Sequence, residues 1–171
     1  MDNIDVLIDS TEIEKRLDEL AIEIMKDYNG EELIFVGVLK GAATFMIELA
    51  KRIKTSVEFE FIQAKSYEGT KSTGKIQISQ DLIGKVEGKN VIIIEDIVDT
   101  GRTLEYLMNY LKQYNAKSIK IACLLSKSVR RVVELNVDYI GFSIPDEFVI
   151  GYGMDYNGKY RNLPYIGVLR N

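Results

Sequence analysis

Three acidic residues followed by a short polar loop form the most chemically informative segment of the chain. Residues 91–104 read VIIIEDIVDTGRTL, so Glu95 and Asp96 directly follow four β-branched residues and Asp99 precedes the loop. Two adjacent carboxylates are costly to place at the end of a buried strand unless they bind a ligand. Carboxylates are suited to sugar hydroxyl groups or to a hard cation such as Mg²⁺.

The loop after these acids has the composition of a phosphate-binding turn. Thr100, Gly101, Arg102 and Thr103 lie where a strand is expected to pass into a helix. At such a turn, free backbone N–H groups and the positive end of the helix dipole bind phosphate. The threonine hydroxyls add donors, and the glycine permits close approach. The segment therefore predicts a ribose phosphate ligand, with the acids on the ribose and the amides on the phosphate.

A purely structural interpretation of this segment remains open. Asp99 or Thr100 could cap a helix while the acid pair is solvated, as at many strand-to-helix turns. The chain contains neither Gly-Lys-Ser/Thr nor GxGxxG, which argues against the common nucleoside-triphosphate and dinucleotide loops.

The composition narrows the possible reaction classes. The chain has 171 residues, no histidine and one cysteine, and its formal net charge is -4. Without histidine, Ser-His-Asp and Cys-His mechanisms and imidazole metal sites are excluded. Cys123 lies in an apolar run and is expected to be a buried structural thiol. The acidic balance argues against a large nucleic-acid-binding surface, so no nucleic-acid partner is expected.

Length and hydrophobicity predict one soluble domain. With 46% hydrophobic residues, a chain of 171 residues can bury a substantial core. No apolar run approaches the roughly 18 residues that a membrane span needs. Residues 1–10 carry Asp where a signal peptide would carry Lys or Arg. We therefore expect a single domain over residues 1–171, no membrane partner and a cytoplasmic location.

The elements that must position the acids follow from apolar periodicity. Residues 33–39, 91–94 and 119–125 are continuously apolar, as strands buried on both faces are. Helical spacing follows the first two of these runs. The alternation predicts an α/β fold, an open, mostly parallel twisted sheet with helices on both faces. Ligands in such sheets bind at the carboxyl ends of the strands.

Other segments complete this prediction. Thr11 and Glu14 have the spacing of a capping box, which predicts a helix that begins there and ends near Asn29. Residues 66–74 (SYEGTKSTG) are small and polar and predict a flexible loop. The tail after Lys127 has no strong helical pattern. Its short apolar segments at 139–144, 148–150 and 165–169 are expected to form a small β-rich cap at one edge of the sheet.

Four segments resemble a known family. EDIVDTGRTL resembles the signature of the type I phosphoribosyltransferases that binds phosphoribosyl pyrophosphate (PRPP). Residues 37–42 (GVLKGA), 124–127 (LLSK) and 145–169 (PDEFVIGYGMDYNGKYRNLPYIGVL) resemble the bacterial hypoxanthine-guanine phosphoribosyltransferases. The resemblance implies purine salvage, with Mg²⁺-dependent transfer of the 5-phosphoribosyl group from PRPP to hypoxanthine or guanine. The products would be IMP or GMP and pyrophosphate.

The resemblance also implies roles for the acids and the loop. Glu95 and Asp96 would hold the ribose hydroxyls, directly or through Mg²⁺. Asp99 would lie near ring nitrogen 7 of the purine and manage its proton as the catalytic residue. The segment from Asp99 to Thr103 would surround the 5′-phosphate. Arg102 replaces the lysine of many relatives, a harmless departure because only its backbone amide would bind.

On the pyrophosphate side, Lys40 and Gly41 resemble the family's pyrophosphate loop, which implies a cis peptide between Leu39 and Lys40. Arg161 resembles a pyrophosphate contact, and Asp155 resembles a ligand of a second Mg²⁺. An exposed lysine in a tight turn and a surface salt bridge of Arg161 are the plain alternatives.

On the base side, Lys127 would donate to the 6-oxo oxygen, Phe148 would stack on the ring, and the backbone of Val149 would read the ring edge. Ser66 and Tyr67 resemble the pair on the lid that closes over the reacting sugar, within the loop near residues 66–74. The hood over the base would be formed largely by the C-terminal segment. A homodimer or homotetramer is expected from the resemblance.

Two rival functions remain open at this point. The first is a phosphoribosyltransferase that acts on xanthine, adenine or orotate, against which Lys127 and Phe148 argue. The second is a regulatory protein that keeps this fold, senses nucleotide at the PRPP site and binds RNA. The acidic balance of the chain disfavours the second.

Overall fold

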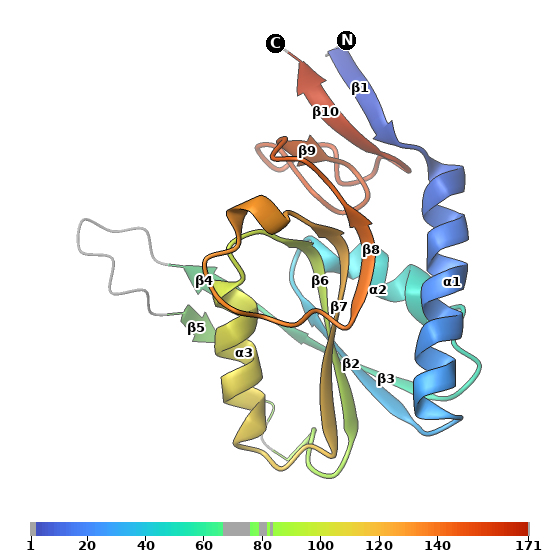
Figure 1. The fold of residues 1–171 in the computed structure, drawn as a ribbon, viewed down its shortest axis with the longest axis vertical. Coiled ribbons are helices and arrows are strands. Elements are labelled where there is room, and N and C mark those ends of the chain that lie inside the picture. Colours follow the sequence, from blue (N-terminus) through green and yellow to red (C-terminus); the bar gives the residue numbers. More distant parts are fainter. Residues whose placement is uncertain (1–2, 67–75, 79–81, 83, 171) are drawn as a thin grey trace.

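The structure is a computed structural model that describes residues 3–66, 76–78, 82 and 84–170 (Figure 1). In chain order the strands and helices are β1 (Asn3–Ile8), α1 (Ser10–Tyr28), β2 (Leu33–Val38), α2 (Ala42–Ala50), β3 (Val57–Ile62), β4 (Ala64–Ser66), β5 (Ile76–Ile78), β6 (Asn90–Val98), α3 (Arg102–Lys112), β7 (Ser118–Ser126), the 3-10 helix η1 (Ser128–Arg130), β8 (Tyr139–Ser143), β9 (Val149–Ile150) and β10 (Ile166–Arg170). Strands alternate with helices from β1 to β3 and again from β6 to β7, while β4 and β5 lie between these parts and short strands follow β7.

The main sheet is parallel throughout the described residues. Its strand order is β3-β2-β6-β7-β8, with β6 at the centre. Every residue of β2 is buried, and so are residues 90–95 of β6, as expected for strands covered on both faces. The predicted open, parallel α/β sheet is confirmed.

Helices cover both faces of this sheet (Figure 1). On β6, Ile92 and Ile94 pack in one core cluster with α1 and α2, whereas Val91 and Ile93 pack in the other with α3. This alternation follows from the period of two in a strand. None of the described helices has the length and apolar content that crossing a membrane requires.

Cys123 is buried in the α3-side cluster, as expected. Burial raises the pKa of its thiol to about 12. At neutral pH this cysteine is therefore a small apolar core residue, and it is not an activated nucleophile.

Helix α1 begins two residues earlier than the sequence predicted. The capping box is formed by Asp9 and Glu12, whose side chains accept the backbone N–H groups of each other at 2.9 and 3.0 Å. The expected box of Thr11 and Glu14 is wrong, because β1 ends at Ile8 and leaves Asp9 as the first residue free to cap. The predicted end is confirmed, since Asn29 closes the helix in the left-handed conformation at φ 47°.

The three tail strands do not form one cap. β8 joins the main sheet as its fifth strand, parallel to β7, although no α-helix connects the two. β10 instead pairs with β9 on one side and, on the other, with β1, a strand that the sequence analysis missed. The three form an antiparallel sheet of order β1-β10-β9. We call this three-stranded sheet with residues 144–165 the hood. Figure 1 shows it beyond the carboxyl ends of the main-sheet strands, with both chain ends side by side.

The loop predicted as a lid lies mostly outside the described residues. Its first residue, Ser66, ends β4, which pairs antiparallel with β5. Tyr67 and residues 68–74 are not described. The expectation of a lid therefore stays a prediction.

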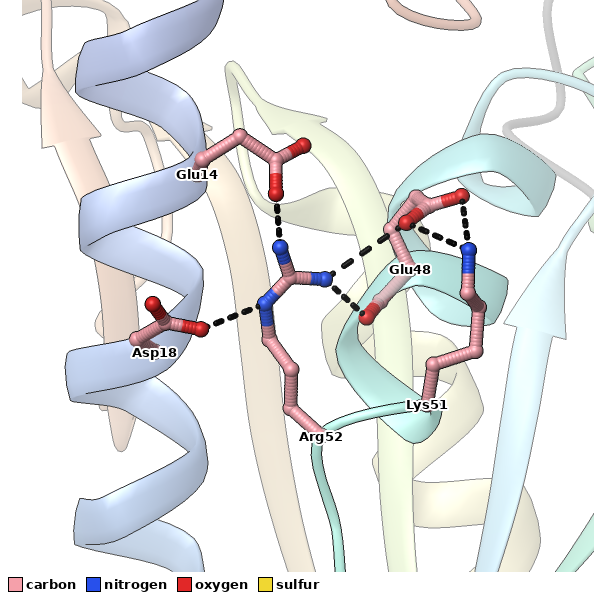
Figure 2. Close-up of polar contacts among 5 residues, drawn as sticks. All are labelled: Glu14, Asp18, Glu48, Lys51 and Arg52. Atoms are coloured by element: carbon pink, nitrogen blue, oxygen red, sulfur yellow. Dashed lines mark hydrogen bonds and ion pairs between the residues drawn. The ribbon is translucent and has the colours of Figure 1, made fainter.

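Arg52 ties α1 to α2 through the network drawn in Figure 2. Its Nε donates to Asp18 at 2.7 Å and one terminal nitrogen donates to the carbonyl of Glu48 at 2.7 Å, while the other contacts Glu14. The Arg52 side chain is 17% exposed. The network thus joins the C-terminal end of α2 to the first half of α1.

We predict that replacing Arg52 by Met lowers the free energy of unfolding by about 1 to 3 kcal/mol, because three carboxylates lose a shared donor. Lys51→Met is the matched control, since Lys51 is 63% exposed and pairs with Glu48. Its effect should stay within about 0.5 kcal/mol. Denaturant unfolding measures both, and equal effects of the two substitutions would refute a special role for Arg52.

Candidate active site

The carboxyl ends of β2, β6 and β7 bring the predicted residues together. The register pairs Gly37 with Ile94 and Val98 with Ser126. The turn after β2 therefore lies beside Glu95 and Asp96, and the residues after β6 lie beside those after β7. A hydrogen bond from the backbone N–H of Lys127 to the carbonyl of Val98, at 3.0 Å, continues this pairing past the strand ends.

Glu95 and Asp96 end the buried part of β6. Glu95 is 9% exposed, and its Oε1 accepts the backbone N–H of Asp96 at 3.1 Å. Asp96 Oδ1 accepts the N–H of Ile97 at 2.8 Å. Burial raises the pKa of the Glu95 carboxyl well above its ordinary value, and the neighbouring Asp96 carboxylate raises it further. An acid pair of this kind, with Glu95 buried and Asp96 half-buried, is stabilised by a cation or by hydroxyl donors.

The turn from Asp99 to Thr103 encloses a cavity of about 90 Å³. Its lining residues are Glu95, Ile97, Val98, Asp99, Thr100, Gly101, Thr103 and Leu104. Gly101 precedes α3 in the left-handed conformation at φ 85°, and a Cβ there would meet side chains of Val133 and Arg131 at 2.8 and 2.9 Å. Glycine is therefore required at this turn. Arg102 is exposed and does not line the cavity.

A second cavity, of about 310 Å³, adjoins the first and shares Ile97 and Asp99 with it. It is lined by Asp96, Ile97, Asp99, Lys127, Arg130, Phe148, Val149, Met154 and Asp155. All three residues predicted to contact a base lie on it. Phe148 is 58% exposed and meets the ring of Tyr156 edge-on at 5.8 Å, so a face of this aromatic ring is accessible.

Lys127 and Asp99 are held by charged neighbours. The Lys127 side chain is 8% exposed and its Nζ lies 3.6 Å from Asp146 Oδ1. Asp99 Oδ1 lies 2.9 Å from Arg130 Nε. Arg131 donates to the backbone carbonyl of Asp99 at 3.3 Å, which fixes the turn itself.

The Leu39-Lys40 peptide is cis, as predicted. Lys40 is exposed, and the following Gly41 touches the acid pair. A Cβ at Gly41 would lie 1.5 Å from Asp96 Oδ2, so only glycine leaves room for that carboxylate. The hood packs closely against this turn at Gly153, where a Cβ would lie 2.2 Å from the carbonyl oxygen of Gly41.

Asp155 and Arg161 form an ion pair at 2.6 Å at the edge of the hood. Arg161 also donates to the carbonyl of Gly153 at 2.6 Å, and Asp155 Oδ2 accepts the N–H of Gly158 at 2.7 Å. Arg161 therefore forms a salt bridge, which is the alternative that the sequence analysis gave to a pyrophosphate contact. It reaches the turn of Gly41 through Gly153, so this salt bridge belongs to the same site.

Sequence reasoning missed Arg130, Arg131 and Asp146. The signal available was weak, namely two consecutive arginines after Lys127 and an acid in the segment PDEF. Ser66 is described by its backbone in β4, and Tyr67 lies outside the described residues, so neither side chain can be placed relative to the two cavities.

The acid pair fits a hard cation only in combination with ligand oxygens. Among residues 3–66, 76–78, 82 and 84–170, no cluster of three or more acidic, cysteine or histidine side chains could hold a metal ion by itself. Glu95 and Asp96 supply carboxylate oxygens, which Mg²⁺ prefers, and the remaining ligands would have to come from substrate and water.

A further cavity, of about 320 Å³, lies at the opposite ends of the strands, near Leu33, Glu58, Lys89 and Asn90. It contains none of the predicted site residues. Asn90 accepts from Ser118 and donates to Glu31, so its buried amide is satisfied within the protein. This end of the sheet offers no set of groups suited to the predicted chemistry.

We predict that Glu95→Gln unfolds at a higher temperature than the wild type when no ligand is bound. A carboxyl whose pKa is raised on folding destabilises the folded state at pH values above its ordinary pKa, by about 1.4 kcal/mol per unit. Glutamine keeps the acceptor for the Asp96 N–H and removes the charge. Glu58→Gln is the control, because the Glu58 side chain on β3 is 53% exposed and its replacement should not raise the melting temperature. An unchanged or lower melting temperature for Glu95→Gln would contradict the prediction.

Comparison with known proteins places this site in a family. Residues 4–157 match the phosphoribosyl transferase domain family. The hypoxanthine-guanine phosphoribosyltransferase of Streptococcus pneumoniae (strain R6) is 49% identical over 166 residues, which cover 96% of this chain and 92% of that protein. The bifunctional protein TilS/HprT of Listeria monocytogenes (serotype 4b) is also 49% identical, but the match covers 26% of its length. The chain thus spans about a quarter of that relative.

Solved structures of phosphoribosyltransferases are also similar to this chain. A hypoxanthine phosphoribosyltransferase from Staphylococcus aureus has a TM-score of 0.92 and 46% identity, covering 97% of this chain and 91% of that chain. A hypoxanthine-guanine phosphoribosyltransferase from Bacillus anthracis has a TM-score of 0.91 and 41% identity, covering 99% of this chain and all of that chain. The chain belongs to the phosphoribosyl transferase domain family and, within it, to the hypoxanthine-guanine phosphoribosyltransferases.

Proposed function

We propose that this protein transfers the 5-phosphoribosyl group of PRPP to hypoxanthine or guanine and releases pyrophosphate. The observation that carries the proposal is the pair of adjoining cavities that share Asp99. The smaller has the backbone turn and glycine of a phosphate site. The larger has a lysine donor and an exposed aromatic ring. The acid pair lies between them, where the ribose would be.

Different residues of the site would bind different parts of PRPP. Backbone N–H groups of residues 100–103 would bind the 5′-phosphate at the start of α3. Glu95 and Asp96 would hold the ribose hydroxyls, and Lys40, Gly41 and Arg161 would contact pyrophosphate.

The purine would stack on Phe148, with its edge along the backbone of Val149. Lys127 would donate to the 6-oxo oxygen. Asp99 would accept the proton of N7 as the neighbouring ring nitrogen N9 bonds to the ribose carbon. These contacts orient the base toward the acid pair.

The reaction needs positioning more than covalent help. The bond from the ribose carbon to pyrophosphate breaks as the bond to the purine forms, which leaves a cation-like ribose in the transition state. The negative charges of Glu95 and Asp96 stabilise this cation, and Lys40 offsets charge on the leaving group. The N7 proton passes to Asp99, which fits the role of a general base.

Mg²⁺ is part of the proposal. Glu95 and Asp96 would hold one ion together with the ribose hydroxyls, and Asp155 would reach a second through pyrophosphate. The ions supply positive charge that neutralises pyrophosphate as it leaves.

The wider organisation follows from the same resemblance. We propose one phosphoribosyltransferase domain over residues 1–171, with the hood over the base and a lid near residues 66–74 that excludes water. A homodimer or homotetramer and a cytoplasmic location belong to the proposal too, and sedimentation measures the assembly directly.

The test of function is nucleotide formation from PRPP and Mg²⁺ with hypoxanthine, guanine, xanthine, adenine and orotate in turn. We expect IMP and GMP from the first two bases and almost no product with adenine, whose amino group cannot accept from Lys127. Activity with another base alone, or RNA binding without turnover, would replace this proposal by one of its rivals.

We predict that Lys127→Met lowers kcat/KM for both 6-oxopurines by at least about 10²-fold and changes PRPP binding little, because methionine keeps much of the stem and loses the donors. Lys159→Met, at an exposed lysine outside both cavities, is the matched control. Titration with PRPP checks binding separately from turnover. An intact hypoxanthine rate in Lys127→Met would remove Lys127 from base recognition.

We also predict that Gly41→Ala folds normally and turns over at least about tenfold more slowly. The backbone of Gly41, at φ -61° and ψ -39°, suits alanine, but the added Cβ would displace the Asp96 carboxylate. Thermal unfolding verifies the fold, and the KM for PRPP should rise. A wild-type KM and kcat would show that Asp96 adapts without loss.

A further inference from the structure

The two residues proposed to face the purine are joined by two charged residues to which the sequence analysis gave no role. Arg130 Nε lies 2.9 Å from Asp99 Oδ1, and another Arg130 nitrogen lies 3.4 Å from Asp146 Oδ1. That same Asp146 oxygen lies 3.6 Å from Lys127 Nζ. Asp99, Arg130, Asp146 and Lys127 thus form a chain of alternating charge along the larger cavity. We call it the charge chain.

Arg130 contacts the inner oxygen of Asp99. Oδ1 is a buried atom, although the Asp99 side chain as a whole is 39% exposed, so the exposed surface belongs to its other atoms. The guanidinium therefore lies against one carboxylate oxygen as an ion pair, without a hydrogen bond to it, and leaves the other oxygen for a ligand. Arg131 does not duplicate this contact, because it donates to the backbone carbonyl of Asp99.

Asp146 connects the charge chain to the hood. It lies between β8 and β9, two residues before the exposed Phe148. Arg130 ends η1, which directly follows Lys127. The contact between Arg130 and Asp146 therefore joins the loop after the main sheet to the segment that carries the aromatic ring.

A 6-oxopurine needs an acceptor and a donor at a fixed spacing on one edge. The N7 proton and the 6-oxo oxygen are neighbours there, so the acceptor of Asp99 and the donor of Lys127 must be correctly placed at the same time. Both side chains follow paired strand ends, but the backbone register alone does not fix where their charged ends lie. The charge chain supplies that constraint.

We propose that Arg130 and Asp146 are positioning residues for the purine, which set the relative placement of the Asp99 oxygen and the Lys127 ammonium. This inference rests on the proposed function. The Arg130 and Asp146 side chains are 47% and 50% exposed, and ion pairs of such exposure contribute little to folding stability. Their loss should therefore act on base recognition and leave folding intact.

The test uses Arg130→Met, Asp146→Asn and the double variant of the whole chain, with hypoxanthine and guanine as bases. Arg170→Met is the matched control, because Arg170 is also 47% exposed and pairs with two acids, Asp5 and Glu147, none of which lines either cavity. Steady-state kinetics give KM and kcat separately for base and for PRPP, and thermal unfolding monitors the fold.

We expect each single variant to lower kcat/KM for the base by about 10- to 100-fold, with the KM for PRPP within about twofold of the wild type. The two losses in kcat/KM should not multiply in the double variant, because both substitutions interrupt the same charge chain. Melting temperatures should match that of Arg170→Met, whose kinetics should equal those of the wild type. Arg130→Lys, which keeps a cation but not the fork geometry, should recover part of the loss.

Three results would each overturn the inference: unchanged base kinetics in Arg130→Met, losses that multiply in the double variant, or a loss of PRPP binding equal to the loss of base binding. The proposed function would still stand in these cases if the wild type forms nucleotide. A wild type that forms no nucleotide with any base would overturn the proposed function and this inference with it.

Discussion

The structure depends on accommodating two adjacent carboxylates, one buried and one half-buried, at the end of its central strand. Glu95 ends the fully buried run of β6, and the charge of Asp96 and the loss of water both raise the pKa of its carboxyl. Such a pair is tolerated where a ligand supplies compensating charge or donors. Gly41 accommodates the pair, because it has no side chain and the Asp96 carboxylate occupies the space that a Cβ would take. The acid pair therefore lowers the stability of the unliganded fold, and a polyhydroxy or cationic ligand that binds there relieves this cost.

The parallel register places the other groups around this pair. Val98 is opposite Ser126, so Asp99 and Lys127 leave the sheet side by side. Asp99 lines both cavities and Lys127 lines the larger one. β2 is one strand further along, and its Gly37 is opposite Ile94, so the Lys40-Gly41 turn meets the acids from the other side. The groups proposed to bind phosphate, ribose, pyrophosphate and base therefore come from loops at the carboxyl ends of the strands, as open α/β sheets favour.

Sequence predicted the parts whose signals are local. The buried strands, the turn after β6 and the positions of Lys40 and Lys127 follow from apolar runs and from the residues at their ends. The capping box failed because Asp9 with Glu12 and Thr11 with Glu14 have the same spacing, and only the end of β1 selects between them. β1 itself was missed because its partner, β10, lies at the other end of the chain.

The hood shares its hydrophobic core with the main sheet, which gives the proposed base site a firm frame. Ile8 at the end of β1, Val149 and Met154 near the base cavity and Ile166 in β10 belong to the same core cluster as the buried faces of α1 and α2. A hood with its own separate core could shift against the sheet, whereas one that shares the main core keeps its spacing to Lys127. The backbone that carries Phe148 is therefore fixed by packing, and what remains adjustable at the cavity is the set of half-exposed charged side chains. In the proposed function, discrimination between purines would depend on how Arg130 and Asp146 hold those side chains, because the backbone fold does not place their charged ends.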